Sequence, residues 1–97
     1  MNLVSLYLVS EQLCSMSNNM VNGKKHSPKE LYCCLRSMFE TSNFAIVILN
    51  LSGEDWLCEV SYNDDGEVSF FIPNTREQED ILYSRVIEML KRIVGEE

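Results

Sequence analysis

The chain has 97 residues, of which 45% are hydrophobic and 24% are charged, and its formal net charge is −7. This length suits one domain spanning residues 1–97, and the composition is that of a globular protein rather than a disordered one. The negative charge argues against direct binding to nucleic acid or to an anionic membrane surface.

The first segment predicts an amphipathic helix over residues 2–22. Its apolar side chains recur at steps of three and four, as expected for a helix with one buried face. The dipeptide Asn22-Gly23 then supplies a C-terminal stop. We expect this stripe to belong to the core of the same chain, with a dimer seam as the alternative, and it comprises Leu6, Val9, Leu13, Met16 and Met20. Residues 1–10 lack a basic region and a cleavage site, so a soluble, cytoplasmic protein is expected.

A second helix is predicted from Ser27-Pro28-Lys29-Glu30, which is a capping box with proline at the first helical position. The helix runs to about Thr41. Its predicted buried face consists of Leu31, Cys34, Leu35 and Met38, with Phe39 beside them.

Three strands are predicted next. Residues 44–49 form a continuous apolar run, which is typical of a strand covered on both faces. Residues 56–62 and 67–72 alternate between apolar and polar side chains, which indicates half-buried strands. The turn at residues 52–55 and the Asp65-Gly66 hairpin signal separate them, so we predict an antiparallel meander.

The last segment predicts a helix from Asn74 or Thr75 to Gly95. Its apolar face contains Leu82, Val86, Met89, Leu90 and Ile93. The predicted fold is therefore α+β, with two N-terminal helices, a three-stranded antiparallel meander, and a C-terminal helix. All three helices are expected on one face of the sheet. The other face would carry Leu57, Glu59, Ser61, Glu67, Ser69 and Phe71.

Acidic side chains are concentrated in one stretch. Residues 40–80 contain ten carboxylates and a single base, Arg76, so their local charge is −9. A surface of one sign attracts surfaces of the opposite sign. Of these ten, nine are predicted to bind a partner: Glu54, Asp55, Glu59, Asp64, Asp65, Glu67, Glu77, Glu79 and Asp80.

The residues that could carry chemistry do not form a recognisable catalytic or metal motif. The only histidine, His26, lies in a basic connector and is interpreted as a solvated loop residue. No Cys or His pair has the spacing of a zinc site. The loop at residues 63–67 is rich in oxygen ligands, but Ser61 and Ile72 stand where a calcium loop needs acids. We therefore predict no enzyme activity, no cofactor and no metal, with cysteines that are reduced and structural.

Two functional hypotheses follow. The first is a non-enzymatic protein that docks its acidic surface on a basic protein, such as a nuclease or another nucleic-acid-binding protein. In size and charge the chain resembles small phage-encoded inhibitors of restriction or CRISPR nucleases, which implies a nucleic-acid mimic. The acids could instead serve solubility alone.

The second hypothesis is a partner protein of the secretion-chaperone or immunity type. The order of helix, three-strand meander and helix is similar to part of the type III secretion chaperone fold, which has two further strands and another helix. The resemblance implies a homodimer that binds through apolar grooves, with Trp56, Leu57 and Phe71 more important than the acids. A salt series would separate the two hypotheses, because only acidic docking should weaken steeply with ionic strength.

Overall fold

The computed structural model describes residues 1–95, which form an α+β fold with one antiparallel sheet. Three helices, α1 (Leu3–Met16), α2 (Pro28–Met38) and α3 (Arg76–Gly95), accompany five strands. The strands are β1 (Met20–Val21), β2 (Lys24–Lys25), β3 (Phe44–Leu51), β4 (Glu54–Tyr62) and β5 (Val68–Phe71). Their order across the sheet is β2-β1-β3-β4-β5.

The meander is confirmed as β3, β4 and β5, but the sheet is larger than predicted. The first helix ends at Met16 rather than near Asn22, because residues 20–25 form the short β1–β2 hairpin. Asn22 and Gly23 both have positive φ, which is the geometry of a tight two-residue hairpin turn. Val21 then pairs with Leu49 and joins this hairpin to β3.

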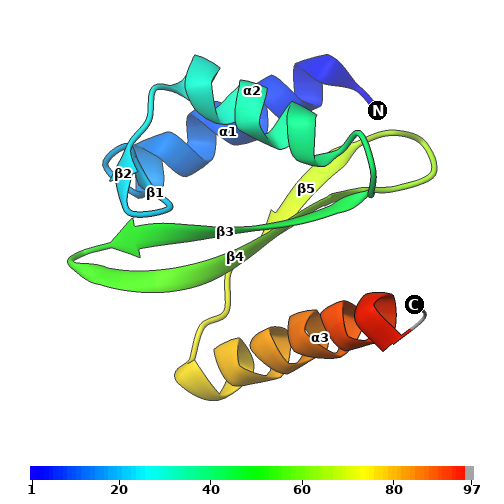
Figure 1. The fold of residues 1–97 in the computed structure, drawn as a ribbon. Helices are drawn as coiled ribbons and strands as arrows, with labels where there is room; N and C mark the ends of the chain where they lie inside the picture. Colours follow the sequence, from blue (N-terminus) through cyan, green and yellow to red (C-terminus); the bar gives the residue numbers. More distant parts are fainter. Residues whose placement is uncertain (96–97) are drawn as a thin grey trace.

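The helices occupy both faces of the sheet, which corrects the prediction that they share one. α1 and α2 cover one face and α3 lies under the other (Figure 1). On one face of β3, the side chains of Ala45, Val47 and Leu49 are buried in the core beneath α1 and α2. On the opposite face, Ile46 is half-buried and Ile48 is 40% exposed. The predicted burial of β3 on both faces is thus complete on one face and partial on the other.

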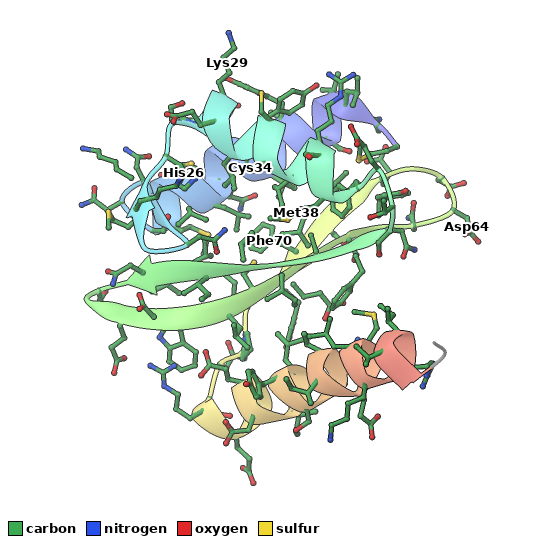
Figure 2. The ribbon with its side chains drawn as sticks, in the orientation of Figure 1. His26, Lys29, Cys34, Met38, Asp64 and Phe70 are labelled. Carbon is green, nitrogen blue, oxygen red and sulfur yellow. The ribbon has the colours of Figure 1, made fainter. Side chains whose placement is uncertain are left out.

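The core lies between the helix pair and the sheet. α1 contributes Leu6, Val9 and Leu13, so its apolar stripe is intramolecular as predicted, although Met16 is exposed. α2 contributes Leu31 and Leu35. Phe70 of β5 packs against the same cluster and projects toward α2 (Figure 2). Each methylene group buried in this layer stabilises the fold by about 0.8 kcal/mol, so the layer is the main source of stability.

The β4–β5 turn needs its glycine. Gly66 has φ +83 and is buried, and a Cβ on it would lie 3.2 Å from the backbone of both Met1 and Asn2. The backbone N–H of Asn2 donates to the carbonyl oxygen of Gly66 at 2.7 Å. The start of α1 is therefore fixed against this turn. A second link comes from the Ser5 hydroxyl, which accepts a hydrogen bond from the N–H of Val68 at 3.1 Å.

None of the helices within residues 1–95 is long and apolar enough to cross a membrane.

The predicted capping box of α2 is present. The Ser27 hydroxyl accepts from the Glu30 N–H at 3.2 Å, and the Glu30 carboxylate accepts from the Ser27 N–H at 3.0 Å. The backbone hydrogen bond from Ser27 is the main cause that lowers the pKa of the exposed Glu30. A lowered pKa stabilises the fold above the unfolded-state pKa. That contribution is lost as the pH falls through the folded-state pKa.

Ser27→Ala should lower the free energy of unfolding by about 1 kcal/mol at pH 7, because the Glu30 N–H in the first turn of α2 loses its hydroxyl acceptor. The measurement is urea denaturation followed by circular dichroism, with Ser37→Ala in the same helix as the matched control. The Ser37 change should be neutral or slightly stabilising, since alanine is the better helix former. Equal destabilisation by both changes would contradict the capping role.

Candidate protein-binding surface

The first turns of α3 are attached to the sheet by a network centred on Arg76. Its guanidinium lies 3.7 Å from the ring centroid of Trp56, and its Nη1 donates to the Asp55 carbonyl oxygen at 2.9 Å. The same Nη1 lies 2.8 Å from Glu79 Oε1. A cation stacked on an aromatic ring and paired with a carboxylate is a favourable arrangement.

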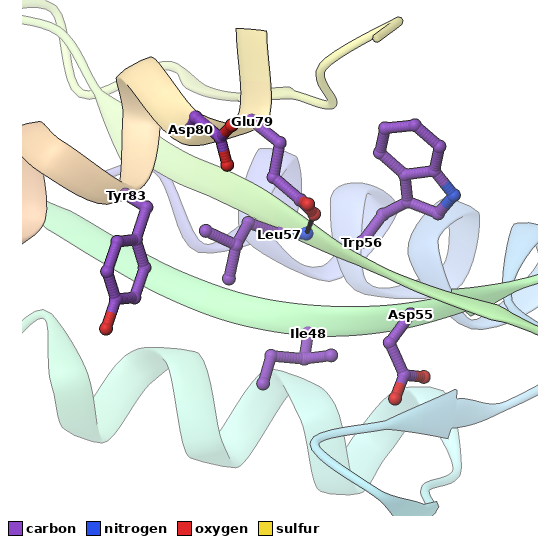
Figure 3. A pocket seen from close by; sticks show the side chains of 7 residues that line it. All are labelled: Ile48, Asp55, Trp56, Leu57, Glu79, Asp80 and Tyr83. Carbon is purple, nitrogen blue, oxygen red and sulfur yellow. Dashed lines mark hydrogen bonds between the residues drawn. The ribbon is translucent and has the colours of Figure 1, made fainter. Parts of the chain in front are cut away.

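Glu79 completes this network on the sheet. Its second carboxylate oxygen, Oε2, accepts from the backbone N–H of Leu57 at 2.8 Å (Figure 3). Leu57 lies beyond the end of β5, whose pairing with β4 reaches only Glu59. The side chain of Glu79 is only 17% exposed. Its role is therefore to hold α3, and it is the least accessible member of the predicted acidic set together with Glu59.

Glu59 is also engaged inside the molecule. Its carboxylate lies 3.5 Å from Nη1 of Arg85 on α3, and its side chain is 17% exposed. The face predicted to be an open acidic sheet is thus partly covered by α3, and one of its two carboxylates, Glu59, is paired with an arginine of that helix. Glu67, the other, accepts a hydrogen bond from the Asn2 side chain at 3.1 Å.

Apart from Glu59, the predicted binding residues fall into two groups rather than one continuous surface. We call the first group the acidic end; it surrounds Arg76 and comprises Glu54, Asp55, Glu77, Glu79 and Asp80. The second group is the hairpin tip, which comprises Asp64, Asp65 and Glu67. The nine residues of β4 separate them by about 26 Å, and Asp64 projects from the far turn (Figure 2).

The acidic end borders a groove between α3 and the sheet. The groove has a volume of about 360 Å³, and Figure 3 shows that Tyr83 of α3 and Ile48 of β3 border it together. Ile48, Leu57 and Tyr83 give it an apolar floor, while Asp55 and Asp80 supply carboxylates. Sequence reasoning missed Ile48 and Tyr83, because it placed α3 on the other face. The continuous apolar run of β3 was the signal that this face needed a cover.

The charges at the acidic end are only partly balanced. Arg76 contacts Glu54 at 3.7 Å and Glu79 at 2.8 Å. The Asp55 carboxylate accepts from the Asn50 amide at 3.1 Å. Within residues 1–95, Glu77 and Asp80 have no salt bridge and are exposed. Five carboxylates and one arginine leave this end of the molecule with a charge of −4.

His26, the residue that could have acted as a catalytic base, is packed inside the fold. His26 is only 5% exposed, which corrects its interpretation as a solvated loop residue. Its Nδ1 lies 3.1 Å from the Lys24 carbonyl oxygen, and its own carbonyl oxygen faces the Cys14 thiol at 3.6 Å. Across residues 1–95, no three His, Cys, Asp or Glu side chains gather closely enough to hold a metal ion.

All four cysteines are free, and they differ in burial. Cys14 and Cys58 are buried, Cys34 is intermediate and Cys33 is exposed. Burial, assisted by the nearby Glu59 carboxylate, raises the pKa of Cys58 to about 12. Burial and the Glu30 carboxylate also raise the pKa of Cys14. Thiolate is the reactive form, so both buried thiols are poor nucleophiles.

The sequence matches no protein-family model, and neither the curated proteins nor the solved structures contain a significant match to it.

Arg76→Ala should release the start of α3 from Trp56. We expect the free energy of unfolding to fall by about 1 kcal/mol and the emission of Trp56, the only tryptophan, to change in the native state. The matched control is Arg85→Ala, which removes another α3 arginine from a carboxylate without touching Trp56. Native emission identical in Arg76→Ala and the unmodified chain would show that the stacking does not hold the helix.

Thiol alkylation should follow burial. Iodoacetamide at pH 8 should modify Cys33 first and Cys34 more slowly, while Cys58 and Cys14 react only after unfolding in guanidinium, since their raised pKa values keep them protonated. Peptide mass spectrometry of the quenched reaction gives each rate. Native alkylation of Cys58 as fast as Cys33 would contradict the described packing of β4.

Proposed function

We propose that this protein is a non-enzymatic binding module that docks its acidic end on a basic surface of another protein. The supporting observation is the uncompensated charge of −4 around Arg76, at the point where α3 meets the sheet. The only base in this region is already used by Trp56, Glu54 and Glu79. The remaining carboxylates are free to attract a cationic partner.

The groove suggests how such a partner would be held. Lysine and arginine have apolar stems and charged ends, so they fit sites that pair an apolar floor with a carboxylate. Ile48 and Leu57 would pack against the stem, and the Asp55 carboxylate would receive the charged end. Glu54 and Glu77 would steer the approach, because exposed charges act mainly on the rate of association.

The narrower form of this proposal names the partner class. We propose a nucleic-acid-binding protein, such as a nuclease, with the chain acting as an inhibitor of the phage-encoded type. Such a site is built to neutralise phosphates, so carboxylates can occupy it.

The test is a charge-reversal comparison in a pull-down from a lysate of the source organism. The combined variant Glu54→Lys, Asp55→Lys and Glu77→Lys should lose its partner. The unmodified chain should keep the partner near 50 mM salt and lose most of it by about 200 mM. All three residues are exposed, and the reversals remove only the Glu54–Arg76 pair and the Asn50–Asp55 hydrogen bond. Each reversal should therefore change the free energy of unfolding by at most about 1 kcal/mol.

The matched control reverses Asp64 and Asp65 at the hairpin tip, which changes charge at the opposite end of β4. Retained binding there, with binding lost at the acidic end, supports the proposal. Binding that survives reversal of the acidic end would assign its acids to solubility alone. Added duplex DNA should displace the chain if the partner site is a nucleic-acid site, and failure of displacement would remove the narrower form.

A further inference from the structure

α3 has more apolar surface than the sheet covers. Within its 20 residues only Leu82 is buried, at 1% exposure. Two apolar rows run along the helix side by side. The first, Leu82, Val86, Met89 and Ile93, begins at this buried contact with the sheet, while its last member is 61% exposed. Helices in proteins gain most of their stability from packing of an apolar face, so burial of the second row against another surface would stabilise α3.

The second row has the spacing of a helix–helix seam. We call it the α3 seam; it consists of Tyr83, Ile87, Leu90 and Val94, at steps of four, three and four. That alternation is the heptad pattern of helices that pair side by side. Tyr83, Leu90 and Val94 are 57%, 51% and 66% exposed.

A hollow on the α3 seam could accept one side chain from a facing helix. It measures about 390 Å³ and is lined by Ile87, Leu90, Lys91 and Val94, with Gly95 at its end. Residues at i, i+3, i+4 and i+7 form the four-residue hole into which a knob from a facing helix inserts. The hole lies in the second half of α3, and the seam's only aromatic side chain, Tyr83, lies in the first half.

Charge selects the orientation of the facing helix. Asp80 and Lys91 border the α3 seam on the same side, near opposite ends of the helix. In an antiparallel pair of identical helices, Lys91 of each copy would approach Asp80 of the other. In a parallel pair Asp80 of one copy and Lys91 of the other would lie on opposite sides of the seam and near opposite ends, so they could not pair. A second copy of α3 therefore supplies both the aromatic knob and the complementary charge.

We propose that the protein forms a two-fold symmetric homodimer through an antiparallel pair of α3 helices. Tyr83 of each copy inserts into the hole between Ile87, Leu90 and Val94 of the other. Asp80 pairs with Lys91 of the second copy at both ends of the seam. The dimer uses Tyr83 and Asp80, which also border the groove, whereas the docking of a basic partner is tested at Glu54, Asp55 and Glu77, which lie outside the seam.

Sedimentation velocity of the purified chain tests the dimer without any partner protein. The unmodified chain should sediment as a dimer, and Leu90→Lys should raise the dissociation constant at least about tenfold. The matched control is Ile81→Lys, which places the same charge on an equally exposed apolar residue of α3, away from the seam. It should leave the dimer intact. Circular dichroism should show both variants folded, because both positions are exposed.

A charge swap checks the orientation. Asp80→Lys and Lys91→Asp should each weaken the dimer, and the two changes combined in one chain should restore it. A monomer at all concentrations up to about 1 mM would overturn the proposal, as would equal weakening by Leu90→Lys and Ile81→Lys. Failure of the combined charge swap to restore the dimer would overturn the antiparallel arrangement.

Discussion

The attachment of the first two turns of α3 to β4 determines what this molecule exposes. Leu82 packs against the sheet, Glu79 binds a backbone amide of β4, and Arg76 stacks on Trp56. These contacts lie within the first half of the helix, and the apolar side chains beyond them become steadily more exposed. The same attachment brings the acidic end together and turns the α3 seam outward. One small set of contacts thus presents both proposed interaction surfaces.

The acidic stretch has two physical roles that sequence alone could not separate. Glu79 and Glu59 are mostly buried and face arginines of α3, so their charge holds the helix. Glu77 and Asp80 lie on the same helix, are exposed, and have no salt bridge within residues 1–95. A lone carboxylate in partly apolar surroundings is costly, whereas a solvated one costs little. Only the exposed members can contribute to the attraction of a partner.

Local signals predicted the individual elements well, and the errors arose where distant segments meet. The capping box at Ser27, the Asp65-Gly66 turn and the order of the three meander strands were predicted, although β3 and β4 are longer and β5 is shorter than expected. Asn22-Gly23 is equally a hairpin signal, but it was interpreted as a helix stop. β1 and β2 have only two residues each, which is too short to leave a strand pattern in the sequence. The side of the sheet that α3 occupies depends on long-range packing. The apolar run of β3 had nonetheless indicated a cover on both faces, which three helices on a single face could not provide.

The small β1–β2 hairpin and two side-chain hydrogen bonds have a consequence for how the sheet can associate. β2 ends the sheet on one side with Lys24 and Lys25, whose charge discourages another strand from joining. On the other side Ser5 occupies the N–H of Val68, and Glu79 occupies that of Leu57. Strand addition is therefore disfavoured at β2, at the start of β5 and at Leu57 of β4. A partner that reaches these positions would contact side chains rather than extend the backbone ladder.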